Sequence, residues 1–273
     1  MTVIDLTASI DLERYPLLEP GSPVLRDRIG EARAALAEKG VALLPGFLTR
    51  EALRATSAEI EKLLPRAHLE DVAVGTPYLE LPDGSFPDGH PRRTQVHSKT
   101  WVLAHDLVPE EAVIRRLYHW DGLMTFAGEI LETESLYRFA DPLGALNLTC
   151  MNEGHVQGWH FDSTDFVVSI GVQSSESGGD FECVPFIRSD ESECYDAVAR
   201  VLRGEADARV EVFPMTPGTL MIFQGRHSLH RVSPVRGSRP RHVALLAYDT
   251  RPGTNSSDLL KLVRYGRTTS AST

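Results

Sequence analysis

GWHFD at residues 158–162, followed much later by SLHRV at residues 228–232, is the part of the sequence that decides the fold. Side chains two residues apart on a β-strand share a face, so His160 and Asp162 point together while the phenylalanine between them points away. His230 lies 68 residues beyond Asp162 at the start of another strand-like segment, and from a facing sheet it can complete a triangle. Two imidazoles and one carboxylate in this arrangement predict a metal site with open coordination positions.

A second pattern extends this metal site. Three such ligands form the facial triad of non-haem Fe(II) oxygenases, whose open positions accept a bidentate co-substrate and O2. His-x-Asp alone is frequent by chance, but PGTLMIF at 217–223 supplies a turn and a strand leading to His230, and Arg241 opens the last strand 11 residues after that histidine. A co-substrate with two carboxylates needs a fixed guanidinium fork at its far end. Arg239 shares strand parity with Arg241, so the sequence leaves open which arginine provides it.

Short strands surround both segments. They are rich in β-branched and apolar residues and are separated by Gly, Pro and Ser turns, and one helix at about 191–203 interrupts them. This spacing is typical of a sandwich, barrel or jelly roll and not of a parallel sheet. The predicted strands cover residues 145–151, 165–173, 180–186, 208–213, 219–223, 230–235 and 241–248.

The first half of the chain has a helical pattern. Apolar residues at three- and four-residue steps predict a helix over 23–39, Thr49 is placed to cap a second helix that Pro65 ends, and a third is expected from about Pro109 to Leu131. A short buried strand is predicted within 40–48. Seven Gly and Pro residues make 75–93 a long loop, of the kind that serves as a binding loop or lid.

Composition excludes several classes of protein. The chain has 273 residues, 42% of them apolar and 24% charged, and no apolar run approaches the length that spans a bilayer. The net charge of −10 argues against a nucleic-acid partner, because an acidic surface repels phosphate backbones. Three cysteines cannot build a disulfide framework, and the acidic start lacks the features of a signal peptide. These observations predict a cytoplasmic globular protein without a membrane partner, and leave open whether it forms a homo-oligomer.

With these motifs the chain resembles the 2-oxoglutarate/Fe(II)-dependent dioxygenases. The resemblance implies an α+β fold with a double-stranded β-helix core, a jelly-roll or cupin-like barrel, and helices flanking it. It implies a single domain over 1–273, with a mainly helical region at 1–134, the core at 135–250 and a C-terminal extension at 251–273. It also implies that His160, Asp162 and His230 bind Fe(II), that Arg241 or Arg239 anchors 2-oxoglutarate, and that O2 is the second co-substrate.

A narrower resemblance rests on residues 159–188 and 225–253. These stretches are similar to a bacterial branch that includes halogenases of free lysine and their hydroxylating relatives. Such halogenases replace the carboxylate ligand with a small residue, and this chain keeps Asp162. The resemblance therefore implies hydroxylation of a C–H bond in a small polar metabolite, with a free amino acid or derivative as the expected substrate, and release of succinate and CO2. Desaturation or cyclisation, a peptide substrate, and a cupin-like binding protein without redox activity are the alternatives.

Five further residues are weaker candidates for the site. Arg92 or Arg93, at the end of the long loop, could clamp a substrate carboxylate, or either could be a solvated loop charge. Asp141 and Asp165 could meet a substrate ammonium group, although capping or surface roles explain them as well. Asn147, on the first core strand, could donate a hydrogen bond to 2-oxoglutarate or have a structural role.

Overall fold

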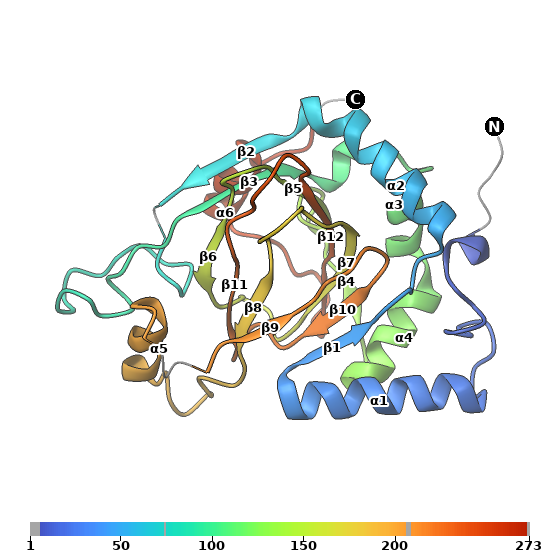
Figure 1. Cartoon of the computed structure of the whole chain (residues 1–273), viewed down its shortest axis with the longest axis horizontal. Helices are drawn as coiled ribbons and strands as arrows, with labels where there is room; N and C mark the ends of the chain where they lie inside the picture. Colours follow the sequence, from blue (N-terminus) through green and yellow to red (C-terminus); the bar gives the residue numbers. More distant parts are fainter. Residues whose placement is uncertain (1–5, 74, 206–208, 272–273) are drawn as a thin grey trace.

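The computed structural model describes residues 6–73, 75–205 and 209–271. The two ends of the predicted domain and Ala208, the first residue of the predicted strand 208–213, lie outside these ranges. The described chain folds as a barrel of two facing antiparallel sheets with helices around it (Figure 1). Within the described residues, no helix is both long enough and apolar enough to cross a membrane.

The larger sheet has seven strands, and every neighbouring pair in it is antiparallel. Its strands, from one edge to the other, are β1 (Val41–Leu44), β10 (Leu220–Phe223), β7 (Val167–Gln173), β12 (Arg241–Leu246), β5 (Leu146–Met151), β3 (Ser98–Leu103) and β2 (His68–Val72). Strands β2 and β3 were not anticipated from the sequence. Because β1, β2 and β3 all come from the region before residue 135, the predicted boundary at 134/135 does not separate a helical part from the barrel.

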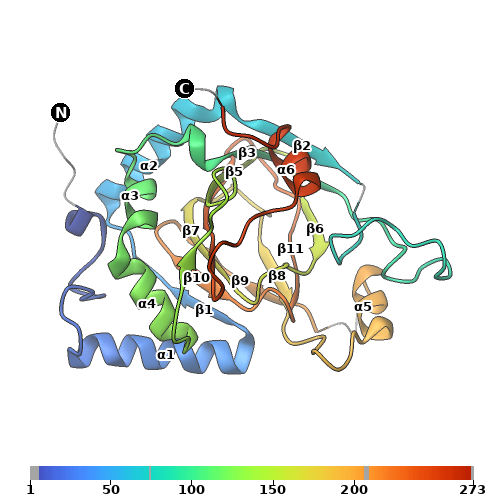
Figure 2. The ribbon, with the colours of Figure 1, turned by 180° about the vertical axis from the view of Figure 1, so that it is seen from behind.

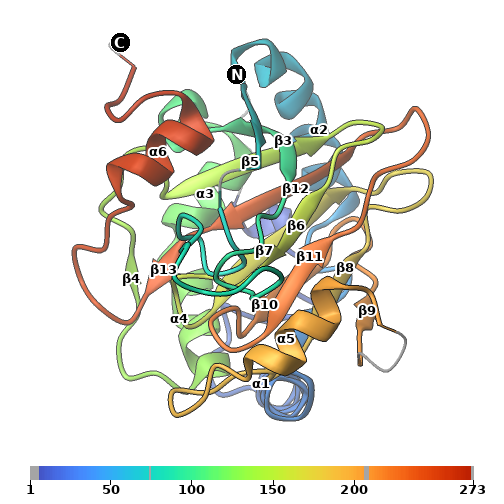
Figure 3. The same cartoon turned by 90° about the vertical axis from the view of Figure 1, so that its left-hand side faces the viewer.

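The smaller sheet faces the larger one and carries the histidines. Its order is β6 (Gln157–His160), β11 (Leu229–Val232), β8 (Phe181–Val184) and β9 (Glu211–Phe213). Two short strands, β4 (Tyr137–Arg138) and β13 (Tyr248–Asp249), pair separately. The alternation expected around the first histidine is present, since Trp159 packs outside the barrel with Val198 and Val201 of α5 (Tyr195–Leu202). Figure 3 shows α5 in front of this sheet.

Four helices cover the outer face of the larger sheet (Figures 1 and 2). They are α1 (Pro23–Lys39), α2 (Arg50–Leu63), α3 (Val113–His119) and α4 (Asp121–Leu131). The predicted caps of the first two are present, because the Thr49 hydroxyl accepts the Ala52 amide and Gly40 adopts a left-handed φ of 65°. The single helix predicted from Pro109 to Leu131 is wrong, since Trp120 has an extended backbone (φ −82°, ψ 123°) that splits it in two.

The remaining elements are one helix and three single-turn segments among the described residues. A last helix, α6 (Asp258–Tyr265), packs on β2 and β3, capped by the Ser257 hydroxyl and ended by Gly266 at φ 66°. Three short 3-10 helices complete the chain: η1 (Leu6–Ser9), η2 (Leu64–Arg66) and η3 (His105–Leu107). The loop predicted over 75–93 is present and extends to His97, and it lies beside α5 on the same side of the molecule (Figures 1 and 2).

Candidate active site

His160, Asp162 and His230 converge inside the barrel. His160 ends β6 and is directly opposite His230 in β11. Nε2 of His160 lies 3.7 Å from Oδ1 of Asp162, and Nε2 of His230 lies 3.3 Å from Oδ2 of the same carboxylate. The three candidate ligand atoms all lie within 4.8 Å of one another. They are close enough to share one ion at metal–ligand distances of about 2.0–2.2 Å.

Backbone carbonyls set the orientation of both imidazoles. Nδ1 of His160 lies 2.8 Å from the Gly158 carbonyl, and Nδ1 of His230 lies 2.9 Å from the Ser228 carbonyl. A carbonyl only accepts, so each Nδ1 must be the protonated nitrogen. In a neutral ring with this tautomer Nε2 carries the lone pair, the arrangement that a metal-binding histidine needs.

Electrostatics also favour a cation between these groups. Burial, reinforced by the neighbouring His230, lowers the pKa of His160 to about 4, so the ring is neutral at pH 7. Burial acts to raise the pKa of Asp162, but the nearby His230 and His160 outweigh it and hold that pKa below its ordinary value. Oδ2 of Asp162 is buried without a hydrogen-bond partner among the described residues. A buried carboxylate oxygen beside two imidazole lone pairs fits a divalent metal such as Fe(II).

A glycine makes room for the carboxylate ligand. The Gly225 carbonyl accepts the Asp162 amide at 3.0 Å, which places the glycine Cα against the carboxylate. A Cβ built on Gly225 would lie 2.8 Å from Cγ and 2.9 Å from Cβ of Asp162, closer than real Cβ atoms approach. The sequence analysis did not single out Gly225, because the requirement depends on a contact between residues 63 positions apart.

Arg241 and Arg239 have different surroundings. Arg241 is 7% exposed and lines a cavity of about 180 Å³ with Ser175, Gly179 and Met215. Its guanidinium lies 3.9 Å from the sulfur atoms of Met151 and Met215, and burial lowers its pKa to about 10. Arg239 instead donates hydrogen bonds at the surface to the Ser174 and Ser175 carbonyls. Arg241 is thus the arginine with a buried, weakly paired guanidinium.

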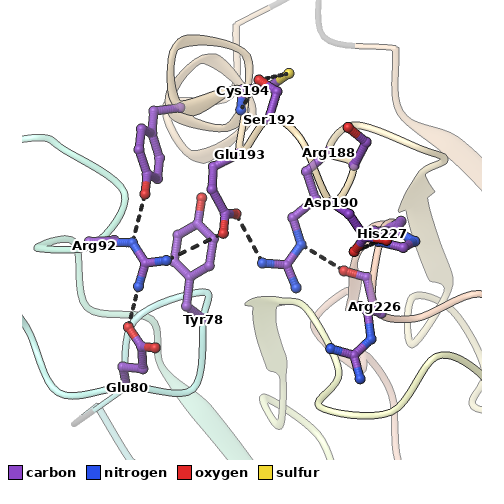
Figure 4. A network of polar contacts seen from close by, with 12 residues as sticks. Tyr78, Glu80, Arg92, Arg188, Asp190, Ser192, Glu193, Cys194, Arg226 and His227 are labelled. Carbon is purple, nitrogen blue, oxygen red and sulfur yellow. Dashed lines mark hydrogen bonds and ion pairs between the residues drawn. The ribbon is translucent and has the colours of Figure 1, made fainter.

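Arg92 lies in a polar network that joins the long loop to α5 (Figure 4). Its Nε donates to the Tyr195 hydroxyl at 2.8 Å, and its other nitrogens contact Glu80 and Glu193. The sequence had given Arg92 a possible role as a substrate clamp. In the structure its guanidinium has three protein partners that fasten the loop, and a role in substrate binding stays a prediction.

The same network reaches the strand that carries the metal ligands. Arg188 contacts Glu193 at 3.0 Å and lies 3.9 Å above the ring of Phe161, which sits between the two ligands of the first motif. The Phe161 amide also donates to the Pro77 carbonyl of the loop at 2.8 Å. The loop therefore holds the segment around residue 161 in place from outside the barrel.

Two other candidates are paired at the surface. Arg93 donates to the Phe86 carbonyl at 2.9 Å and contacts Asp88 at 3.0 Å, both within its own loop. Asp165 accepts a hydrogen bond from Arg226 and is more than half exposed. Their roles in substrate binding remain predictions.

Asp141 and Asn147 are buried and bonded to the protein. Asp141 accepts the Leu143 amide at 2.9 Å and the Ser256 amide at 3.2 Å, which is a turn-capping arrangement. Asn147 accepts a hydrogen bond from the Tyr265 hydroxyl at 2.8 Å and donates to the Leu143 carbonyl at 3.0 Å. The Asn147 amide nitrogen also donates to the Leu146 carbonyl at 2.8 Å, so both of its donors are used within the protein, and the Tyr265 contact ties β5 to α6.

Comparison with known proteins gives the family. The sequence profile described as Halogenase D (HalD) matches residues 24–259. The chain belongs to this family. Membership of the Halogenase D family together with the His-Asp-His triad confirms the expected enzyme class, the 2-oxoglutarate-dependent non-haem iron oxygenases. No curated protein matched the sequence.

Solved structures similar to this Halogenase D protein support the fold. A 2OG-Fe(II) oxygenase family oxidoreductase from Burkholderia pseudomallei is 19% identical with a TM-score of 0.54, over 87% of this chain and 95% of that one. AviO1 from Streptomyces viridochromogenes Tue57 is 16% identical with a TM-score of 0.55, over 84% and 97%. The epimerase SnoN, solved with Fe3+ and alpha-ketoglutarate, is 15% identical with a TM-score of 0.55, over 82% and 84%. At these identities the likeness confirms the double-stranded β-helix and no more.

Proposed function

We propose that this protein is an Fe(II)/2-oxoglutarate-dependent oxygenase that hydroxylates an unactivated C–H bond of a small polar metabolite, a free amino acid or a close derivative. Asp162 is the observation that supports this most. It places a carboxylate against both histidine Nε2 atoms, so the chain presents three metal ligands and not the two of a halogenase of this branch.

Each site residue has a defined task in this proposal. His160, Asp162 and His230 hold the iron, and Arg241 binds the distal carboxylate of 2-oxoglutarate in its cavity. When bound, iron with 2-oxoglutarate and O2 supplies the oxidation of the C–H bond, with release of succinate and CO2. The protein positions the substrate and excludes water from the reaction. Both ligand histidines are buried in the barrel, where aromatic side chains such as Phe223 pack against them; its ring centroid lies 4.9 Å from that of His230.

Anaerobic reconstitution with Fe(II), followed by O2, 2-oxoglutarate and a panel of free amino acids, tests this function. Succinate and substrate mass are followed together by mass spectrometry. Succinate that rises with one panel member, alongside a gain of one oxygen atom in it, is the expected result. Loss of two hydrogens would replace hydroxylation by desaturation or cyclisation, and a chlorinated product would replace it by halogenation. No succinate from iron-loaded protein under any condition would favour the cupin-like binding protein.

A further inference from the structure

A buried carboxylate on the edge strand of the larger sheet faces the inside of the barrel. Met151 is directly opposite Arg241, whose guanidinium lines the 2-oxoglutarate cavity, so both point inward. Thr149 shares that face because it is two residues from Met151. In β3, Val102 is opposite Thr149 and therefore shares its face, and so does Thr100, two residues from Val102. Glu70, opposite Thr100, ends this series and therefore points inward.

The last helix brings an arginine to this carboxylate. Nη1 of Arg264 lies 3.4 Å from Oε2 of Glu70, and the two side chains are only 16% and 9% exposed. The neighbouring residue of α6, Tyr265, donates its hydroxyl to Asn147 at 2.8 Å, and Asn147 shares the inward face of β5 because it is two residues from Thr149. The pair thus lies on the inward face of the larger sheet, at the edge that α6 covers.

Arg264 also shares a hydrogen bond with the Tyr265 side chain, but the Glu70 carboxylate has binding capacity left. Oε2 of Glu70 has no hydrogen-bond partner in the part of the chain that the structure describes, and 3.4 Å is long for a charge-assisted hydrogen bond. Removing two charges from water costs several kcal/mol per ion, and a loose pair recovers little of it. A guanidinium and a carboxylate side by side in a dry site are complementary to a molecule with one carboxylate and one ammonium group.

We propose that Arg264 and Glu70 bind the zwitterionic head group of the substrate, with Arg264 receiving its carboxylate and Glu70 its ammonium group. This inference rests on the proposed function and names its substrate class as a free α-amino acid. It also assigns the recognition to the edge strand and the last helix, and not to Arg92 or Arg93, whose carboxylate partners lie in the long loop and just before α5.

Paired ligands test this assignment. The twenty proteinogenic L-amino acids, their carboxamides and their N-acetyl derivatives are titrated calorimetrically into the anaerobic Fe(II)/2-oxoglutarate protein, and succinate formation is measured in parallel. For the amino acid that binds, the carboxamide and the N-acetyl form should each bind about 10- to 100-fold more weakly. Arg264→Gln should remove the preference over the carboxamide alone, and Glu70→Gln the preference over the N-acetyl form alone.

Arg267→Gln is the matched control. Arg267 also belongs to the C-terminal segment, but it follows α6 and its guanidinium makes two hydrogen bonds to Asp106, at 2.8 and 2.7 Å. It should leave both preferences unchanged. If Arg264→Gln does not fold, Arg264→Lys keeps the charge without the planar fork, and it should lower the preference over the carboxamide about tenfold.

Three results would overturn the inference. One is an unchanged preference over the carboxamide in both Arg264 variants, which would make the residue a structural clamp. Another is equal binding of an amino acid and its carboxamide by the unaltered protein. The third is binding of no amino acid by a protein that does form succinate from 2-oxoglutarate. Each of these leaves the proposed oxygenase standing, whereas absence of succinate under every condition refutes the proposed function itself.

Discussion

Replacing Gly225 by alanine should weaken metal binding although all three metal-ligating residues are unchanged. The new Cβ would lie 2.8 Å from Cγ of Asp162, and an ordinary contact begins at about 3.4 Å, so the carboxylate carbon must move by roughly 0.6 Å or more. Metal–oxygen bonds of about 2.0–2.2 Å tolerate errors of only about 0.2 Å. Loss of such support typically costs about 10- to 100-fold in metal affinity, or about 1.4–2.7 kcal/mol.

Binding of Mn(II), a divalent ion that does not oxidise during the titration, measures this effect through the electron paramagnetic resonance signal of the free ion. Gly84→Ala is the control, because no atom lies within 4 Å of a Cβ at that position. The decisive comparison measures Mn(II) binding with Gly225→Ala in an Asp162→Gly background, where no carboxylate remains to be displaced. There the alanine should change Mn(II) affinity by less than about twofold.

An equal loss of affinity in both backgrounds would refute the reasoning, because the alanine would then act through the backbone of residue 225 and not through the carboxylate. An unchanged affinity in the Asp162 background would also refute it. Near-ultraviolet circular dichroism of each variant shows whether the barrel is intact, so that a loss from unfolding is recognised.

Three other predictions concern separate parts of the barrel. Arg241→Lys should raise the calorimetric Kd for 2-oxoglutarate about 10- to 100-fold, while Arg239→Gln should stay within about twofold; equal effects would contradict the assignment. Asp162→Ala should abolish substrate hydroxylation measured by mass spectrometry, and hydroxylation at the parent rate would show that Asp162 is not a ligand. Burial lowers the pKa of His242 to about 4 from about 6.5 in the unfolded chain, so the unfolded state takes up the proton first as pH falls. The loss of unfolding free energy between pH 7 and pH 5, measured with urea, should therefore be about 2 kcal/mol smaller in His242→Leu than in the parent protein, and an equal loss would contradict the buried neutral ring.

The metal triad could be predicted because its information is local. Strand alternation places His160 and Asp162 on one face whatever the rest of the fold does, and a second strand motif supplies His230. The choice between Arg239 and Arg241 could not be made in this way. Both have the same parity, and only the structure shows that β12 begins at Arg241 while Arg239 is still in the preceding turn.

What the sequence missed depends on long-range contacts. Glu70 and Arg264 are 194 residues apart, and nothing in either neighbourhood indicates that α6 closes over β2. The helix itself could have been predicted, since Ser257 and Gly266 are ordinary capping residues around DLLKLVRY. The break at Trp120 has no comparable signal, because residues 109–131 keep an apolar pattern compatible with one helix.

The two buried arginines, Arg241 and Arg264, are suited to ligands of different charge. Among the described residues the hydrogen-bond contacts of the Arg241 guanidinium are two methionine sulfur atoms at 3.9 Å, so its buried charge favours a ligand that brings negative charge, as the distal carboxylate of 2-oxoglutarate would. Arg264 already has Glu70, so a ligand of zero net charge satisfies both groups without leaving either unpaired. Arg241 opens a central strand of the larger sheet, whereas Glu70 and Arg264 lie on its edge strand and on the terminal helix. Substitutions at that edge can therefore change which substrate is bound while the 2-oxoglutarate site stays intact. Under the proposal made above, the substrate specificity of this enzyme is determined at the β2–α6 end of the barrel.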